Sequence, residues 1–214
     1  MGRRSVNAIS VPALLLFLTA IPTVMAGVRV VQIPAGTTPQ DVAYLMTQPL
    51  PYWLHAAAGA TFGLLGPLQF GRALAQRFGR LHKFLGRIFV AAGVVLGLSG
   101  LRLLLAFPGS STLIIDVARM LGGIVLLVAL ALAIRAVMDR DIPRHRAWMI
   151  RAYAIGMGQS LIAFILFPIY LITGEPPVGV MSDLTVVASW ALSIAAGEWV
   201  IRRINRPAPI QIHT

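Results

Sequence analysis

Two histidines of this sequence stand among arginines, close to the start of long apolar segments. His82 follows Arg80 by two positions, and His145 lies between Arg144 and Arg146. Two neutral imidazoles that face each other across a helical bundle can hold a haem iron from both sides, and nearby arginines can pair with the haem propionates. The pattern makes His82 and His145 candidate ligands of haem b, with the three arginines as candidate propionate contacts.

The same residues have a structural interpretation, which the sequence favours. Membrane cytochromes usually carry their histidine ligands deeper in a span than the edge of an apolar segment. At the membrane surface, a histidine beside an arginine more often binds a lipid phosphate or caps the inner ends of neighbouring helices. Both interpretations of His82 and His145 stay open at this point.

Two more polar residues fall within an expected span. His55 lies about one turn from its outer end, beside Trp53, and Gln69 lies deeper. Ionisable groups at membrane depth are functional candidates, so His55 is a candidate proton-relay or quinone-contact residue. A histidine that is satisfied at the interface beside a tryptophan is the more frequent case. His55 is too far from His82 and His145 to share a metal ion with them.

Arg102 and Asp116 flank a tight turn, Pro108-Gly109-Ser110-Ser111-Thr112, at about the same distance on either side. In an antiparallel hairpin this places both charges at one depth, where pairing is the cheapest way to keep a charge in the bilayer. Arg119, three residues after Asp116, can share the same carboxylate. The sequence predicts a clasp within the hairpin, and the alternative is a polar cavity that opens outward.

The composition identifies the class of protein. Of 214 residues, 57% are hydrophobic and 12% are charged, and the mean hydropathy is +0.81. Soluble domains carry about 25% charged residues. The apolar residues form runs of roughly 20, the length that crosses a bilayer core. We therefore expect an all-α, polytopic integral membrane protein.

The net charge of +11 does not indicate nucleic-acid binding, because the basic residues occur in short clusters between apolar runs. Their distribution instead predicts attraction to anionic phospholipid. The chain has no cysteine, which excludes disulfides, thiolate metal sites and a cysteine nucleophile. It also lacks a phosphate-binding glycine loop, a zinc-type HExxH and a nucleophile elbow. The sequence therefore identifies no catalytic residue and predicts no metal site. Whether the chain is an enzyme stays open, and the sequence favours a protein that is not one.

Six transmembrane helices are predicted in one domain. They cover residues 8–28, 52–74, 84–107, 113–137, 148–172 and 184–201, with a polar tail at 202–214. All basic residues except Arg29, Arg102 and Arg119 fall on the N-terminus, two connecting loops and the tail. This bias predicts that both chain ends lie in the cytoplasm, in a bacterial inner membrane. The first run is either a transmembrane helix, which we favour, or a cleaved signal peptide ending at Val24-Met25-Ala26.

Two details of these spans bear on function. Pro168 is expected to interrupt the fifth span near its outer end. Glu198 is expected to pair with Arg202 four residues later, or else to reach the arginines around the second inner loop, which include Arg151. Homo-oligomerisation stays open.

The segments that begin at His82 and His145 share a layout. Each has a basic residue directly after the histidine, then an aromatic residue (Phe89, Tyr153) and a glycine (Gly93, Gly156). Both begin helices that run in the same direction. Two duplicated helical hairpins would produce this echo, and so would convergence at inner-face helix starts.

The residues described so far also resemble a known bacterial family over about residues 50–200. The resemblance rests on four stretches: His55; Gly66-Pro67-Leu68-Gln69-Phe70; His82-Lys83-Phe84-Leu85-Gly86-Arg87-Ile88-Phe89; and His145-Arg146-Ala147-Trp148-Met149-Ile150-Arg151-Ala152-Tyr153. The family is described as "predicted membrane protein", domain of unknown function 2306, and often has arginine where this chain has Lys83. The resemblance implies a membrane fold and carries no activity with it.

Three functional hypotheses follow. The first is an inner-membrane protein whose basic cytoplasmic face binds anionic lipid or a partner. The second is a haem-binding or quinone-linked electron-transfer protein that uses His82 and His145. The third is a small-solute transporter with an outer cavity formed by His55, Gln69, Arg102 and Asp116.

Overall fold

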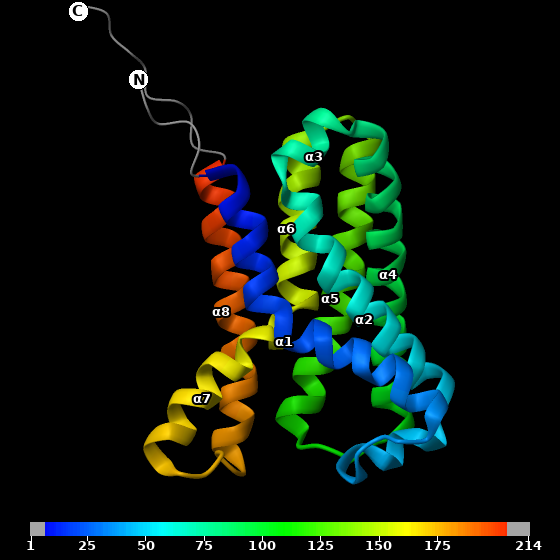
Figure 1. Cartoon of the computed structure of the whole chain (residues 1–214), viewed down its shortest axis with the longest axis vertical. Coiled ribbons are helices and arrows are strands. Elements are labelled where there is room, and N and C mark those ends of the chain that lie inside the picture. Colours follow the sequence, from blue (N-terminus) through cyan, green and yellow to red (C-terminus); the bar gives the residue numbers. More distant parts are fainter. Residues whose placement is uncertain (1–6, 205–214) are drawn as a thin grey trace, which may run out of the picture.

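The computed structural model describes residues 7–204, and within them the chain forms helices and no strand (Figure 1). Arg3, Arg4 and residues 205–214 of the predicted tail lie outside the described residues. The elements are α1 (Asn7–Ala35), the 3-10 helix η1 (Gln40–Thr47), α2 (Pro49–Phe70), α3 (Arg72–Arg77), α4 (Gly79–Ala106), α5 (Leu113–Met138), α6 (Ile142–Gly156), the 3-10 helix η2 (Gly158–Leu161), α7 (Ile162–Thr173) and α8 (Val180–Ile204).

The helices have two distinct ends. At one end lie α3, the turn Asp139–Asp141 and the last turn of α8, and we call this the basic end (Figure 1). At the other end, called the far end here, lie η1, the turn between α4 and α5, and the turn between α7 and α8. The two segments predicted as inner loops therefore share one end of the molecule. Both candidate histidines stand in the first turns of helices, His82 in α4 and His145 in α6.

Four described helices are long and apolar enough to cross a membrane: α4, α5, α8 and the Pro12–Ala35 part of α1. The pair formed by α6 and by η2 with α7 makes a fifth if it counts as one bent span. Helix α2 does not reach that hydropathy. It is packed between α1 and α4, so much of its surface meets protein instead of lipid. A helix in this position can carry His55, Thr61 and Gln69 without exposing them to hydrocarbon.

The fifth expected span is interrupted, but not at the position that the sequence predicted. The helix breaks at Met157–Leu161, where α6 and α7 meet at 55°, while Pro168 lies inside α7. Two glycines, Gly156 and Gly158, weaken the helix at the break. Helix α1 also differs from its expected range, because it continues to Ala35 into the segment predicted as an outer loop.

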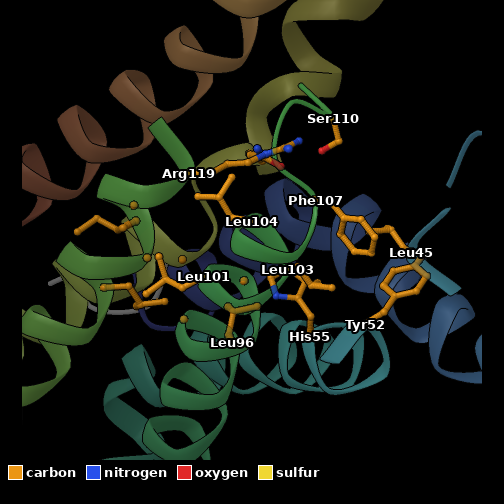
Figure 2. Close-up of a pocket in the computed structure, with 18 of the residues that line it drawn as sticks. Leu45, Tyr52, His55, Leu96, Leu101, Leu103, Leu104, Phe107, Ser110 and Arg119 are labelled. Atoms are coloured by element: carbon orange, nitrogen blue, oxygen red, sulfur yellow. The ribbon is translucent and has the colours of Figure 1, made fainter. Parts of the chain in front are cut away.

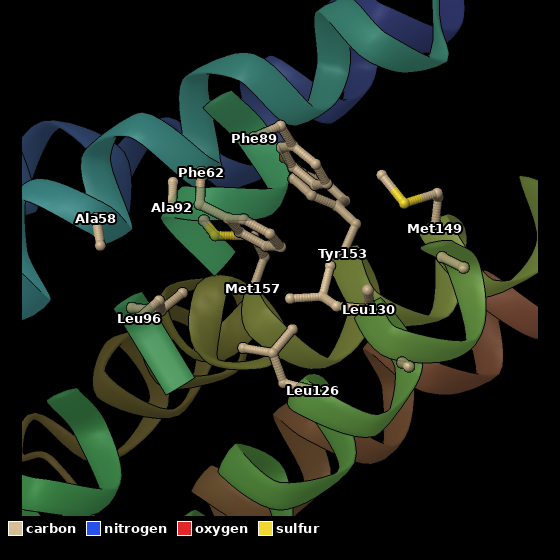
Figure 3. Close-up of a cluster of buried hydrophobic side chains, with 13 residues drawn as sticks. Ala58, Phe62, Phe89, Ala92, Leu96, Leu126, Leu130, Met149, Tyr153 and Met157 are labelled. Carbon is tan, nitrogen blue, oxygen red and sulfur yellow. The ribbon is translucent and has the colours of Figure 1, made fainter. Parts of the chain in front are cut away.

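An aromatic layer closes the middle of the bundle (Figure 3). Phe62 of α2 and Phe89 of α4 are fully buried, and their rings stack with centroids 4.3 Å apart. Tyr153 of α6 lies 5.7 Å from Phe62 between ring centroids. A Cβ atom at Gly93 would lie 2.8 Å from the Phe62 ring, and one at Gly156 would lie 2.6 Å from it. The absence of a side chain at Gly93 and at Gly156 therefore allows both α4 and α6 to pack against the Phe62 ring.

Tyr153 ties three helices together at this layer. Its hydroxyl lies 3.3 Å from the Thr19 Oγ1 of α1 and 3.3 Å from the Gly63 carbonyl oxygen of α2, and its one proton is shared between these two acceptors. The ring packs directly on Gly66, where any Cβ atom would overlap it. Gly66 is therefore needed for the approach of α6 to α2.

Candidate functional site

The break between α6 and α7 is held by side chains of α8. The Trp190 Nε1 donates to the Ile155 carbonyl at 3.1 Å, and the Ser189 hydroxyl donates to the Gly158 carbonyl at 2.6 Å. The Ser193 hydroxyl donates to the Ala154 carbonyl at 2.8 Å. A helix that ends inside a membrane leaves carbonyl groups without partners, and each unsatisfied group costs several kcal/mol in hydrocarbon (about 4–8 kcal/mol for a peptide amide). The α8 donors satisfy three such groups.

A cavity of about 380 Å³ opens between the break and the far end (Figure 2). Its walls come mainly from α2, α4, α5 and η1, with Trp190 of α8. Its side chains with polar atoms are Tyr44, Tyr52, His55, Ser110, Arg119, Gln159 and Trp190, and the rest of the lining is largely leucine and glycine. Figure 2 shows Arg119 near Ser110, with His55 and Leu96 at the opposite wall. The break lies at the base of this cavity through Gly156 and Gln159.

His55 has a defined hydrogen bond at the cavity wall. Its Nδ1 lies 3.2 Å from the Ser99 Oγ, and the Ser99 hydroxyl donates to the Val95 carbonyl at 2.6 Å. Because that hydroxyl proton is already used, Ser99 accepts from His55. The Nδ1 atom then carries the proton, and Nε2 of a neutral ring is an acceptor. A Cβ atom at Gly100 would lie 3.2 Å from the ring, so the absence of a side chain at Gly100 leaves room for the His55 ring.

The predicted clasp between Arg102 and Asp116 does not form. The Arg102 Nη2 donates to the Gln48 Oε1 at 3.2 Å, and Asp116 accepts instead from the Ser111 hydroxyl. Equal depth in a hairpin does not fix the direction in which each side chain leaves its helix. The Arg119 Nη1 donates to the Ser111 Oγ at 3.1 Å, so one serine links Arg119 to Asp116.

Gln69 also lies away from the far-end cavity. It is buried in α2 toward the basic end, and a Cβ atom at Gly86 of α4 would lie 3.2 Å from its Oε1. Of the four residues expected to form an outer cavity, the structure places only His55 there. It adds Arg119, which the sequence had assigned to the clasp.

A second cavity, a groove of about 540 Å³, runs from the break toward the basic end. It is lined by α1, α6 and α8, together with Phe70 of α2. Its walls are apolar over most of their length, and Arg146 of α6 and Arg203 in the last turn of α8 stand at its basic end. The Arg203 guanidinium lies 4.2 Å from the centroid of the Trp199 ring. We call this site the inner groove.

Arg151 and Glu198 fix α6 to α8 beside the inner groove. The Arg151 Nε lies 2.6 Å from the Glu198 Oε1, and the Nη2 lies 3.1 Å from Oε2. The guanidinium also lies 4.7 Å from the centroid of the Trp148 ring. Of the two expectations for Glu198, the contact with the α6 arginine is confirmed. The pair orients α6 and is not free to bind a ligand.

His82 and His145 lie within electrostatic range of each other at the basic end. The His145 Nδ1 donates to the Ala133 carbonyl of α5 at 2.8 Å, which leaves Nε2 as the atom that can bind a metal. The His82 Nδ1 is buried and has no hydrogen-bond partner in the described chain. Arg80 and Arg144 are exposed nearby on the same helices. Imidazole nitrogens can bind a haem iron, and guanidinium groups can pair with haem propionates.

No group of three or more metal-binding side chains occurs within residues 7–204. The sequence interpretation missed Ser189, Trp190 and Ser193, although their spacing along α8 places polar atoms on one side of an apolar helix. It also missed Gln159, which lines the far-end cavity, and Ser99, whose partner His55 lies 44 residues earlier in the chain. No local pattern indicates either residue.

A comparison with protein families identifies a family for this chain. The family model described as predicted membrane protein (DUF2306) matches residues 52–201. No curated protein and no solved structure matches the chain. The chain belongs to the DUF2306 family, and with its apolar helices it is a multi-pass membrane protein.

Proposed function

We propose that this member of the DUF2306 family binds an anionic phospholipid of the cytoplasmic leaflet in its inner groove. The observation that carries the proposal is the shape of the groove, whose apolar walls lead to Arg146 and Arg203. Apolar walls can bind the acyl chain of a lipid, and the two arginines can bind its negative phosphate. No aspartate or glutamate occurs among the described residues that line the groove.

The break at Met157–Leu161 sets the length of the lipid site. Met157, Ser160 and Leu161 lie at the deep end of the groove, and Arg203 and Ile204 lie at its basic end. The groove therefore runs along part of the bundle and does not continue through it. A single acyl chain that enters beside Arg203 can extend toward the break while its phosphate stays with the arginines.

The lipid proposal includes a topology of six spans with both chain ends in the cytoplasm of a bacterial cell. Helix α2 is the sixth span, shielded from lipid by α1 and α4. Basic residues crowd the α3 segment, the start of α6 and the end of α8, and such segments stay on the cytoplasmic side. The hairpins α2–α4 and α5–α6 are the proposed duplicated units, because Gly93 and Gly156 contact the same Phe62 ring.

Lipid retention tests the proposed function. Protein extracted gently from bacterial membranes should carry phosphatidylglycerol or cardiolipin that native mass spectrometry detects. Replacement of Arg146 and Arg203 by glutamine should release it, because the phosphate loses both charged partners. Equal retention by the variant and the wild type would contradict the proposal.

A second candidate function is haem binding by His82 and His145. Its support is the buried, unpartnered His82 Nδ1, together with the His145 bond that leaves one ring nitrogen available. A bound haem would supply one-electron transfer, for example with a quinone. The chain would contribute the two imidazoles, and Arg80 and Arg144 would hold the propionates.

A further inference from the structure

We infer that the far-end cavity is a binding site for a small amphipathic carboxylate. This inference goes beyond the lipid proposal and does not depend on it, because the two sites share no lining residue. It rests on the charge, the unused hydrogen-bonding groups and the walls of the cavity.

Arg119 sets the charge of the ligand. Among the described residues that line the cavity, it is the one with a formal charge. Its contact is with a neutral hydroxyl, Ser111, while the nearby Asp116 is engaged by that same serine. Asp183, another carboxylate at the far end, accepts from Thr112 at 2.7 Å. The cavity therefore contains a positive charge without a carboxylate in its wall, which favours an anion.

Three polar groups in the wall are available to a ligand. The Tyr52 hydroxyl and the Gln159 side-chain amide make no hydrogen bond within the described chain, and both line the cavity. The His55 ring is held through Nδ1, so Nε2 remains an acceptor. A tyrosine hydroxyl and an amide can donate to carboxylate oxygens, and the histidine can accept from a hydroxyl group on the ligand.

The rest of the cavity wall favours a ligand whose remaining part is apolar. Leu96, Leu126 and Ile155 surround the part of the cavity near the break, and Phe107 and Tyr44 pack edge to face at 5.1 Å near η1. A volume of about 380 Å³ falls in the range of small-molecule sites, about 300–1,000 Å³. A ligand with one anionic group and a hydrocarbon body fits both kinds of surface.

The helix break fixes the orientation of this ligand. Helix α6 ends at Gly156, so its carboxyl-terminal dipole, which is negative, faces the deep part of the cavity. A carboxylate is unfavourable there and favourable beside Arg119. The ligand therefore lies with its anionic group toward Arg119 and its apolar body toward Leu96. Discontinuous helices also form solute sites in membrane transporters, where the sign of the charge at each helix end orients the ligand.

The cavity does not continue to the basic end. Between the cavity and the basic end, the fully buried rings of Phe62 and Phe89 fill the bundle. The site is thus reached from the far end, and the inference concerns binding there.

Calorimetric titration with octanoate tests the inference. The wild-type protein in nanodiscs should bind octanoate saturably, and octanol and octylamine should bind at least about tenfold more weakly, because neither presents an anion to Arg119. Empty nanodiscs correct for partition of the probes into lipid. Saturable binding that does not discriminate between these three probes, or no saturable binding, would overturn the inference.

Two arginine variants place the binding in the cavity. Arg119→Gln should weaken octanoate binding by at least about tenfold, while Arg102→Gln should leave it unchanged. Arg102 is the matched control, because it is exposed at the same end and bonds to Gln48 outside the cavity. Equal affinities of the two variants would overturn the assignment. The variant with glutamine at Arg146 and Arg203 separates this result from the lipid site, since it should bind octanoate like the wild type.

Discussion

The Trp190 indole nitrogen lies 3.1 Å from the carbonyl oxygen of Ile155, the second-last residue of α6. This bond joins α6, which ends inside the bundle, to α8, whose indole N–H donates to a carbonyl oxygen at that end. The same indole packs against Gly158, where any Cβ atom would overlap it. Two features therefore stabilise the break: Gly158, which leaves room for the indole, and the hydrogen-bond donors of α8.

The Trp190 bond predicts a stability difference between two tryptophan variants. Trp190→Phe should lower the free energy of unfolding by about 0.5–1.5 kcal/mol, because it removes a hydrogen bond to a carbonyl group inside the bundle. Trp53→Phe is the control, since the Trp53 Nε1 donates to the Val30 carbonyl at 3.1 Å at an exposed position, where water can replace it. Thermal unfolding in detergent measures both. A Trp190→Phe protein as stable as the control would contradict this account.

Gly66 and Gly27 should respond oppositely to the same substitution. Gly66→Ala places a methyl group in the Tyr153 ring, whereas Gly27 has no atom within 4 Å of such a methyl group. We expect Gly66→Ala to cost about 1–3 kcal/mol through overpacking. Gly27→Ala should be neutral or stabilising by up to about 1 kcal/mol, because alanine favours the helix. Denaturation midpoints in detergent report the difference, and two equal midpoints would be inconsistent with the packing of α6 on α2.

The topology can be tested without background labelling, because the chain has no cysteine. Single cysteines are introduced at Phe78 and Met138 of the basic end and at Tyr44 and Val178 of the far end, where each side chain is exposed. A maleimide that cannot cross the membrane should label the far-end pair in intact spheroplasts. It should reach the basic-end pair only after permeabilisation. Labelling of Tyr44 and Phe78 from one side would exclude α2 as a span.

Haem binding predicts a visible spectrum. Protein from haem-replete cells should show a Soret band that disappears in His82→Ala and in His145→Ala. His55→Ala is the control and should keep the band, because His55 lies in the far-end cavity. A colourless wild-type preparation would exclude this second function.

The sequence was sufficient to predict the helical membrane class and the family, because runs of apolar residues and two local motifs carry that information. The range expected for the fourth span, 113–137, nearly coincides with α5. The break at Met157–Leu161 could not be predicted in this way. Its stability comes from Ser189, Trp190 and Ser193, which follow some thirty residues or more later in the chain, and glycine alone is tolerated within a helix.

The candidate sites show the same limit. Counting residues from the turn placed Arg102 and Asp116 at one depth, but rotation about each helix axis directs Arg102 to Gln48. His55 and Gln69 of α2 were expected to share one outer cavity, yet they lie in different parts of the bundle. Spacing along one helix gives depth, and only the packing of neighbouring helices decides which residues meet.

The groove predicts that charge at two positions matters more than total basic charge. Arg146→Gln with Arg203→Gln removes two charges from the groove, and Lys83→Gln with Arg87→Gln removes two exposed charges from α4 outside it. Both double variants keep the same net charge, so their general attraction to anionic membranes should be similar.

The most direct measurement is native mass spectrometry of these two double variants and the wild type, released from nanodiscs that contain phosphatidylglycerol and phosphatidylcholine. We predict one retained phosphatidylglycerol on the wild type and on the α4 variant, and its loss from the groove variant. Retention on the groove variant at the level of the α4 variant would contradict the proposal that Arg146 and Arg203 hold an anionic lipid.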